Sequence, residues 1–132
     1  MKRIIDGENS VMGRLAAVVA KNALKGDEIV ILNCDKVNIT GNRKRILEDF
    51  REKRKKIGSG QKGPKYSRLS ERIVKRAIRG MIPNHRRGRG KEAFGRIKCF
   101  SGIPKEFEGK KMEKFEGKEK RKYIKVKEVS EQ

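Results

Sequence analysis

The chain has 132 residues, 41% of them charged, and its formal net charge at pH 7 is +20. Ordinary soluble domains carry about 25% charged residues, so a single domain with a small core and a strongly basic surface is expected. No apolar run approaches the roughly 20 residues that span a bilayer, and no N-terminal signal peptide is visible, so we expect a cytoplasmic protein without a membrane partner.

The first third of the chain has the pattern of a strand–helix–strand unit. Residues 4–5 predict a short edge strand that leads into a turn. From residue 10 to residue 23 the apolar residues recur at helical spacing, and Asn9 or Ser10 is the expected N-cap. Residues 28–33 contain four consecutive β-formers, a pattern typical of a strand that is covered on both faces of a parallel sheet. This order predicts a right-handed βαβ unit and therefore an α/β fold.

The middle of the chain adds a short strand at 37–40 and helices at 43–57 and 69–81. In the third helix the apolar residues fall on one face: Ile73, Val74, Ala77, Ile78 and Met81. The opposite face carries arginines at i, i+4, i+8 and i+11, namely Arg68, Arg72, Arg76 and Arg79. One side of this helix is thus predicted to pack and the other to present a line of guanidinium groups.

An apolar elbow at residues 80–83 follows this helix. The elbow begins at Gly80; Met81 is expected to close the buried face of the helix and Pro83 to stop the helix. A flexible cluster of arginines comes next, spaced by Gly88 and Gly90, which we expect to let the chain approach a nucleic-acid backbone closely. Residues 96–100 predict the last strand of this part.

After residue 104 the composition changes to alternating lysine and glutamate. We therefore expect one α/β domain at residues 1–104 and a Lys/Glu-rich C-terminal extension at 105–132. A few apolar residues near position 126 indicate that the extension packs in part, and the rest is expected to be solvated or ordered only by a partner.

The positive charge is concentrated in the middle of the chain, and arginine and lysine are unequally distributed between the middle and the end. Residues 43–104 carry 21 Lys/Arg against five acids, and residues 68–98 alone carry eight Arg and three Lys. Residues 105–132 carry one Arg and nine Lys. Arginine grips phosphate with two parallel hydrogen bonds and stacks on bases, whereas lysine is a strongly hydrated point charge. This segregation predicts a nucleic-acid contact surface in the middle of the chain, of a kind suited to folded RNA.

No enzyme site is indicated. The GSGQKG stretch at 58–63 matches G-x-G-x-x-G but lacks the strand before it and the helix after it, so we interpret it as a flexible basic loop. His85 has no nearby carboxylate partner, and either an RNA contact or a plain surface histidine is consistent with its position. Cys34 and Cys99 form no C-x-x-C motif and are expected to be small buried hydrophobes. We therefore expect no cofactor, no metal and no small-molecule substrate.

Several motifs together resemble a known family, the ribosomal protein L13 family of the large subunit, over about residues 4–104. They are Asp6, GRLA at 13–16, Asn33 and Lys36 with TG at 40–41, RGMIP at 79–83, and the closing stretch 88–102. GIP at 102–104 and KYIKVKEV at 122–129 are more similar to the archaeal and eukaryotic branch than to the bacterial one. Gly7, Cys34 and Ile82 depart from the residues that are usual in the family, and the tail is poorly matched.

The resemblance implies a three-layer α/β/α fold with a small, mostly parallel sheet, and no catalytic activity. It implies a structural role in the large ribosomal subunit, in the cytoplasm, with large-subunit rRNA and neighbouring ribosomal proteins as partners. It also implies that Arg14 faces RNA, together with the basic loop at 54–68 and the segment 79–98. The predicted rRNA-binding residues are Arg14, Arg54, Lys55, Lys56, Lys62, Lys65, Tyr66, Arg68, Arg72, Arg76, Arg79, His85, Arg86, Arg87, Arg89, Lys91, Arg96 and Lys98. A free-standing RNA-binding regulatory protein and a nucleotide-using enzyme remain as alternatives.

Overall fold

The structure is a computed structural model that describes residues 2–55, 67–114 and 122–131. Its elements, in chain order, are β1 (Lys2–Asp6), α1 (Met12–Leu24), β2 (Glu28–Leu32), the 3₁₀ turn η1 (Cys34–Lys36), β3 (Asn38–Thr40), α2 (Arg43–Lys55), α3 (Ser70–Met81), α4 (Gly88–Gly95), β4 (Ile97–Cys99), the 3₁₀ turn η3 (Lys105–Phe107), β5 (Glu113–Lys114), β6 (Tyr123–Lys125) and α5 (Val126–Ser130).

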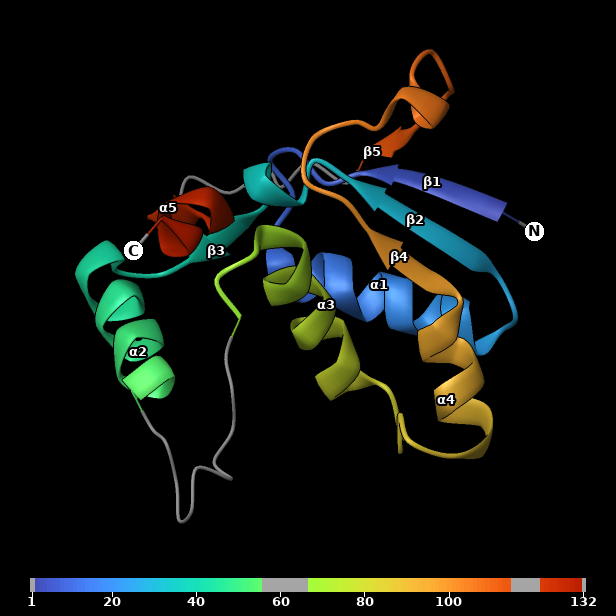
Figure 1. Ribbon diagram of the computed structural model, residues 1–132, viewed down its shortest axis with the longest axis horizontal. Helices are drawn as coiled ribbons and strands as arrows, with labels where there is room; N and C mark the ends of the chain where they lie inside the picture. The colour runs from blue at the N-terminus through green and yellow to red at the C-terminus, as the bar shows by residue number, and fades with distance from the viewer. Residues whose placement is uncertain (1, 56–66, 115–121, 132) are drawn as a thin grey trace.

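The main sheet has four strands in the order β4-β2-β1-β5, and every pair in it is parallel. The strands β1 and β2 pair from Lys2↔Glu28 to Asp6↔Leu32, and α1 connects them, so the predicted βαβ unit is confirmed (Figure 1). The prediction that β1 is an edge strand was wrong, because β5 of the C-terminal extension pairs with it. No local pattern near residue 4 indicates a partner that lies more than a hundred positions away.

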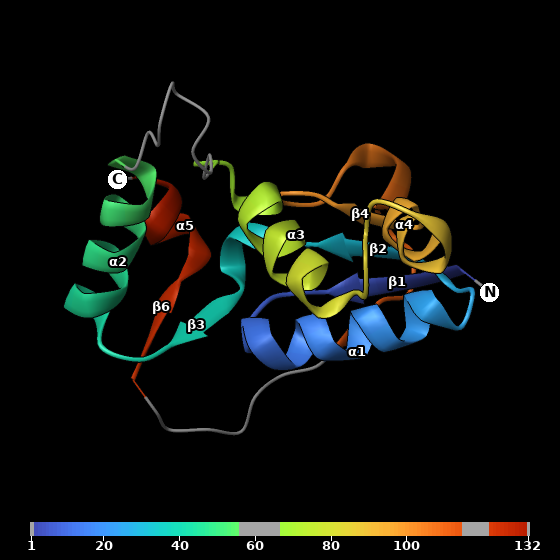
Figure 2. The same ribbon diagram turned by 90° about the horizontal axis from the view of Figure 1, so that it is seen from below.

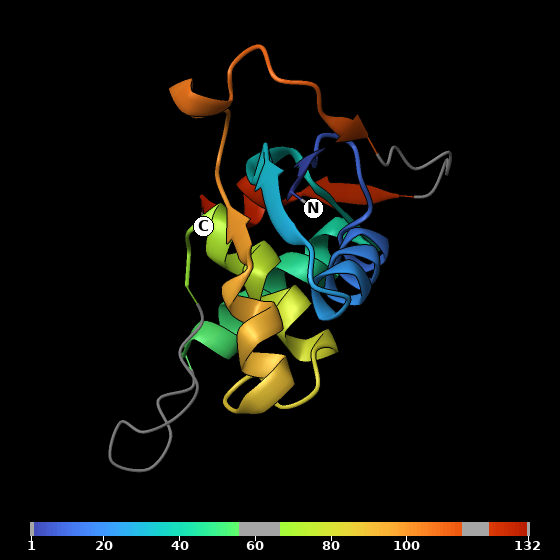
Figure 3. The same cartoon turned by 90° about the vertical axis from the view of Figure 1, so that its right-hand side faces the viewer.

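The two faces of this sheet are covered differently. The helices α1, α3 and α4 lie on one face, and the segment around η3 lies on the other (Figures 1 and 3). Because side chains alternate along a strand, Ile29 and Ile31 of β2 join the main core under the helices. Val30 and Leu32 point the opposite way and pack with Phe107 of η3. The α/β class and the mostly parallel sheet are confirmed. Among the described residues, the face of the sheet opposite the helices is covered by the 3₁₀ turn η3 and the chain on either side of it.

A second sheet forms at one end of the molecule, where β3 and β6 pair antiparallel. In Figure 2 this pair lies beside α2 and α5, at the end opposite the N-terminus. Ile124, Val126 and Val129 are at most 1% exposed and belong to the main core. The strand predicted at 37–40 is therefore present, and the described end of the C-terminal extension supplies its partner.

The start of α1 differs from the expected capping. The N-cap is Val11, in extended conformation and without a side-chain cap, instead of Asn9 or Ser10. Asn9 has a positive φ of 61°, and the backbone of Ser10 is bonded on both sides: its N–H donates to the carbonyl of Gly7, and its carbonyl accepts from the N–H of Asn38. These bonds hold residues 9–10 in a turn and delay the first helical residue to Met12.

The helix α3 begins one residue after its predicted start and ends where predicted, with Ile73, Val74 and Ile78 buried. The prediction that Met81 closes its buried face was wrong, since Met81 is 44% exposed and Ile82 is buried in its place. Ile82 is extended, with φ −97° and ψ 128°, as a residue before proline tends to be. This extended residue turns its own side chain into the core and leaves the last helical residue outside.

The segment after the elbow is a turn that holds Arg86 and Arg87, followed by the helix α4, where the sequence suggested one flexible loop. Gly88 has a φ of +58° and begins α4, and Gly90 is buried. A Cβ at Gly90 would lie 1.9 Å from the carbonyl oxygen of Pro83 and 2.5 Å from that of Asn84. The close backbone approach expected at Gly90 is therefore made within this chain, which fixes α4 against the elbow.

Candidate nucleic-acid interface

The arginine face of α3 is present as predicted. Arg68 precedes the helix and is exposed, as is Arg72, whereas Arg76 and Arg79 are half-buried. The opposite side of the helix packs on α1 in the main core. Because α3 is held along one whole side, the guanidinium groups project from a rigid support.

Four cations follow on the arginine segment, which we define as residues 84–91. All four are exposed, namely Arg86, Arg87, Arg89 and Lys91. His85 is half-buried and packs edge-on against Phe94 of α4 with ring centroids 6.0 Å apart. The Nζ atom of Lys75 lies 4.9 Å from the centroid of the same Phe94 ring, so this ring joins α3 to the arginine segment.

Arg54, near the end of α2, is engaged within the protein. Its Nη1 donates to the carbonyl oxygen of Val129 at 3.2 Å, and its Cζ lies 5.9 Å from the Phe50 ring centroid. Burial and the nearby charge of Arg68 lower the pKa of Arg54. Lys55 beside it is exposed. The end of α2 and the start of α3 thus bring like charges together.

The structure does not bring every predicted residue to this surface. Lys98 pairs in register with Val30, so it points to the η3 face of the sheet, away from α3. Arg96 donates from Nη1 to the carbonyl of Ala23 at 3.0 Å and thereby binds the C-terminal end of α1. Arg14 is exposed on α1. Of the other predicted residues, Lys56, Lys62, Lys65 and Tyr66 lie outside the described residues, as does the GSGQKG stretch.

Sequence reasoning missed three cations that stand beside this surface: Arg51, Lys53 and Lys75. Arg51 lies three positions before the predicted residue Arg54 on α2 and therefore on the same face of the helix, a spacing that could have identified Arg51 as well. Nothing in the sequence indicated that Cys34 and Cys99 interact. The thiol of Cys34 donates to the carbonyl oxygen of Ile31 at 3.7 Å, and the interaction with Cys99, together with burial, raises the pKa of Cys34. The two cysteines meet because Ile31 of β2 pairs with Cys99 of β4.

Residues 2–55, 67–114 and 122–131 contain no group of three or more His, Cys, Asp or Glu that could hold a metal ion. No helix among them is long and apolar enough to cross a membrane.

The fold and this surface define a class: a small, basic α/β protein that presents arginines from one rigid helix and the segment after it. A sequence profile of the family "Ribosomal protein L13" matches residues 1–106. The chain belongs to the ribosomal protein L13 family.

Individual relatives agree. The chain is 41% identical over 113 residues to "Large ribosomal subunit protein uL13" of Archaeoglobus fulgidus, an alignment that covers 86% of this chain and 71% of the relative. It is 46% identical over 112 residues to the protein of that name from Thermoplasma volcanium, with coverage of 85% and 81%. The match to the Methanococcoides burtonii protein of that name is 37% over 134 residues and spans 98% of this chain and 95% of the relative.

Proposed function

We propose that this protein is a structural constituent of the large ribosomal subunit, in the cytoplasm, and that it binds and stabilises folded large-subunit rRNA. Membership of the ribosomal protein L13 family and the printed names of the relatives support the ribosomal role. Its partners are then the rRNA and neighbouring large-subunit proteins, and its contribution is structural and not catalytic.

The observation that carries the rRNA contact is the placement of arginine. Eight arginines fall between residues 68 and 98, and most of them project from α3 and the arginine segment, which the core holds rigid. A rigid support lowers the entropy lost when each guanidinium group pairs with a phosphate. Release of the counterions condensed on the RNA then drives binding.

The test is a salt titration of binding to large-subunit rRNA, measured by filter binding with the full chain. If the surface neutralises about six to ten phosphates, the affinity should fall by about 10³–10⁵ between 50 and 200 mM salt. A nearly flat salt dependence would overturn the proposal. Co-sedimentation with large subunits after a salt wash supports a structural constituent, whereas recovery only in the free fraction supports a free-standing RNA-binding regulator.

A further inference from the structure

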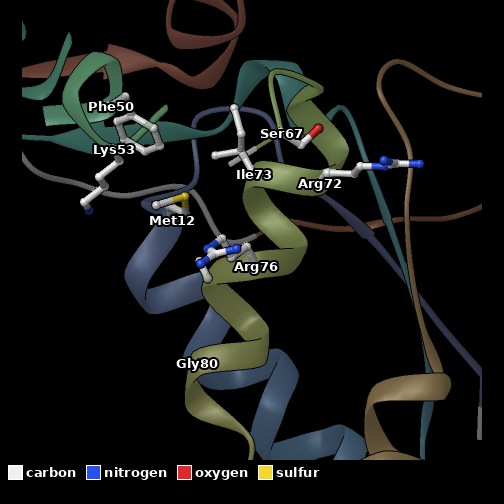
Figure 4. Close-up of a pocket in the computed structure, with 9 residues that line it drawn as sticks. Met12, Phe50, Lys53, Ser67, Arg72, Ile73, Arg76 and Gly80 are labelled. Carbon is white, nitrogen blue, oxygen red and sulfur yellow. The ribbon is translucent and has the colours of Figure 1, made fainter. Parts of the chain in front are cut away.

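A pocket of about 280 Å³ opens between three helices (Figure 4). Its floor is apolar, with Met12 from the start of α1, Phe50 from α2, and Ile73 and Ala77 from α3. Lys53 and Arg76 stand at its sides, from α2 and α3 respectively. The pocket therefore combines an aromatic and aliphatic interior with positive charge at its sides.

A second hollow of about 210 Å³ is lined, among the residues that the structure describes, by four cations: Arg51, Arg54, Lys55 and Arg68. The two cavities adjoin along the chain at two places. On α2, Lys53 lines the pocket and Arg54 the hollow; before α3, Ser67 lines the pocket and Arg68 the hollow. The apolar pocket and the hollow of concentrated positive charge are thus lined by neighbouring residues of the same two parts of the chain.

We propose that this pair of cavities receives one nucleotide that is turned out of a folded RNA, with its base in the apolar pocket and its phosphates at the cation hollow. The proposal rests on the proposed function and deepens it, because it says which part of the RNA this end of the surface takes.

The chemistry of a nucleotide matches both cavities. An unstacked base has two apolar faces and stacks on aromatic side chains such as Phe50. At about 280 Å³ the pocket is slightly smaller than the roughly 300–1,000 Å³ that ligand pockets span, which suits one base and not a stack of several. A backbone phosphate carries a negative charge and can accept charge-assisted hydrogen bonds from the four neighbouring cations of the hollow.

At least one cation of the hollow, Arg54, is positioned by contacts within the protein. The bond from Arg54 to Val129 and the packing of Arg54 near the Phe50 ring hold one cation in place before any ligand arrives. Burial and the charge of Arg68 lower the pKa of Arg54, so the folded protein keeps two like charges close together. A phosphate between them would relieve that repulsion.

The probes are three RNA hairpins of the same sequence: one with a single unpaired adenosine, one with an abasic residue at that place, and one fully paired. Full-length protein should bind the adenosine hairpin more tightly than the abasic one by about 5- to 150-fold, the range that one stacked base contributes. With 2-aminopurine at the unpaired position, its fluorescence should change on binding. The variant Arg68→Gln should weaken binding to the adenosine and abasic hairpins alike, since it removes a phosphate contact.

A matched pair of variants separates pocket filling from general effects. Gly80 lies at the pocket and Gly95 does not. Both lie in the last turn of a helix, both are exposed, and an added Cβ at either meets nothing within 4 Å. Gly80→Leu should bring the ratio of adenosine to abasic affinity to about one, while Gly95→Leu should leave that ratio unchanged. Thermal unfolding of both variants checks that the fold is intact.

Two results overturn the proposal while leaving the proposed function in place: equal affinity of the wild-type protein for adenosine and abasic hairpins together with salt-dependent rRNA binding, or an unchanged ratio in Gly80→Leu. Displacement of the adenosine hairpin by free adenosine monophosphate at equal affinity also overturns it, in favour of a free nucleotide. Absence of binding to any of the hairpins and to rRNA removes both proposals.

Discussion

Gly90 is the residue on which the geometry of the arginine segment depends most directly. The first turn of α4 passes so close to the elbow that a Cβ at Gly90 would overlap the carbonyl oxygens of Pro83 and Asn84. Both partners are backbone atoms, which cannot swing aside as the end of a side chain can. Glycine at this position therefore sets where Arg86, Arg87 and Arg89 emerge from the surface.

Gly90→Ala should lower the free energy of unfolding by about 2–4 kcal/mol, the large end of the range for single substitutions. The physical reason is the steric overlap with the elbow, which α4 can relieve only by moving away. Urea unfolding followed by circular dichroism measures the loss. Gly95→Ala in the same helix is the control, because its Cβ has open space and alanine favours helix. Equal midpoints for the two variants would contradict this account of Gly90.

The contact between Cys34 and Cys99 predicts unequal thiol reactivity. Cys34 is fully buried, and the interaction with Cys99 and burial raise the pKa of its thiol, whereas Cys99 is only half-buried. Since the thiolate is the reactive form, Cys34 should react with Ellman's reagent at pH 8 far more slowly than Cys99. Unfolding in guanidinium chloride should equalise the two rates, and Cys99→Ala should leave only the slow phase. Two thiols that both react at the unfolded rate in native protein would be inconsistent with this burial.

At the scale of elements, the arginine segment and the lysine-rich extension offer a test of whether position or charge matters. The triple variant Arg86→Ala, Arg87→Ala, Arg89→Ala should flatten the slope of log affinity against log salt by about three if each arginine neutralises one phosphate. All three side chains are exposed, so the thermal midpoint should change little.

The matched control for that variant removes three exposed lysines from the extension: Lys105→Ala, Lys110→Ala, Lys111→Ala. Both variants lose the same charge, and the lysine triple should keep the slope near that of the wild-type protein. If the two triples weaken rRNA binding equally, net charge alone determines affinity, and the arginine segment has no special place. Filter binding over a series of salt concentrations provides both slopes.

Helical periodicity located the arginine face well, because the same 3.6-residue period that buries Ile73 and Ile78 turns the arginines outward. It did not find α4, whose short sequence holds only one alanine and one phenylalanine as apolar residues and begins with glycines. Periodicity also did not show that Lys98 points away from the arginine face. The face of the sheet to which a strand side chain points depends on the register of that strand, here the register of β4 with β2. Contacts made at a distance in sequence, such as that of Arg54 with Val129, leave no local pattern.

At the scale of the whole molecule, the βαβ unit and the parallel sheet follow from composition and spacing in the first hundred residues. The strands β5 and β6, which complete the two sheets, could not be predicted from the sequence in this way. The strands β5 and β6 are two and three residues long, and their surroundings are alternating lysine and glutamate, which indicates solvent and not strand. Their pairing with β1 and β3 arises from tertiary contacts across most of the chain. Short strands of this kind are specified by the surface they complete.

The docking of β6 and α5 gives a direct test of how far the fold depends on the end of the chain. Ile124 is 1% exposed and pairs with Ile39 of β3, while its neighbour Tyr123 is 53% exposed. Ile124→Ala should lower the free energy of unfolding by about 2–5 kcal/mol, because it leaves a cavity in the main core. Tyr123→Ala on the same strand should cost no more than about 1 kcal/mol, since it removes mainly a surface contact with Lys125. Both values come from urea unfolding of the full chain. Equal, small losses would mean that the C-terminal segment is not packed as described and that the first 104 residues hold the fold alone.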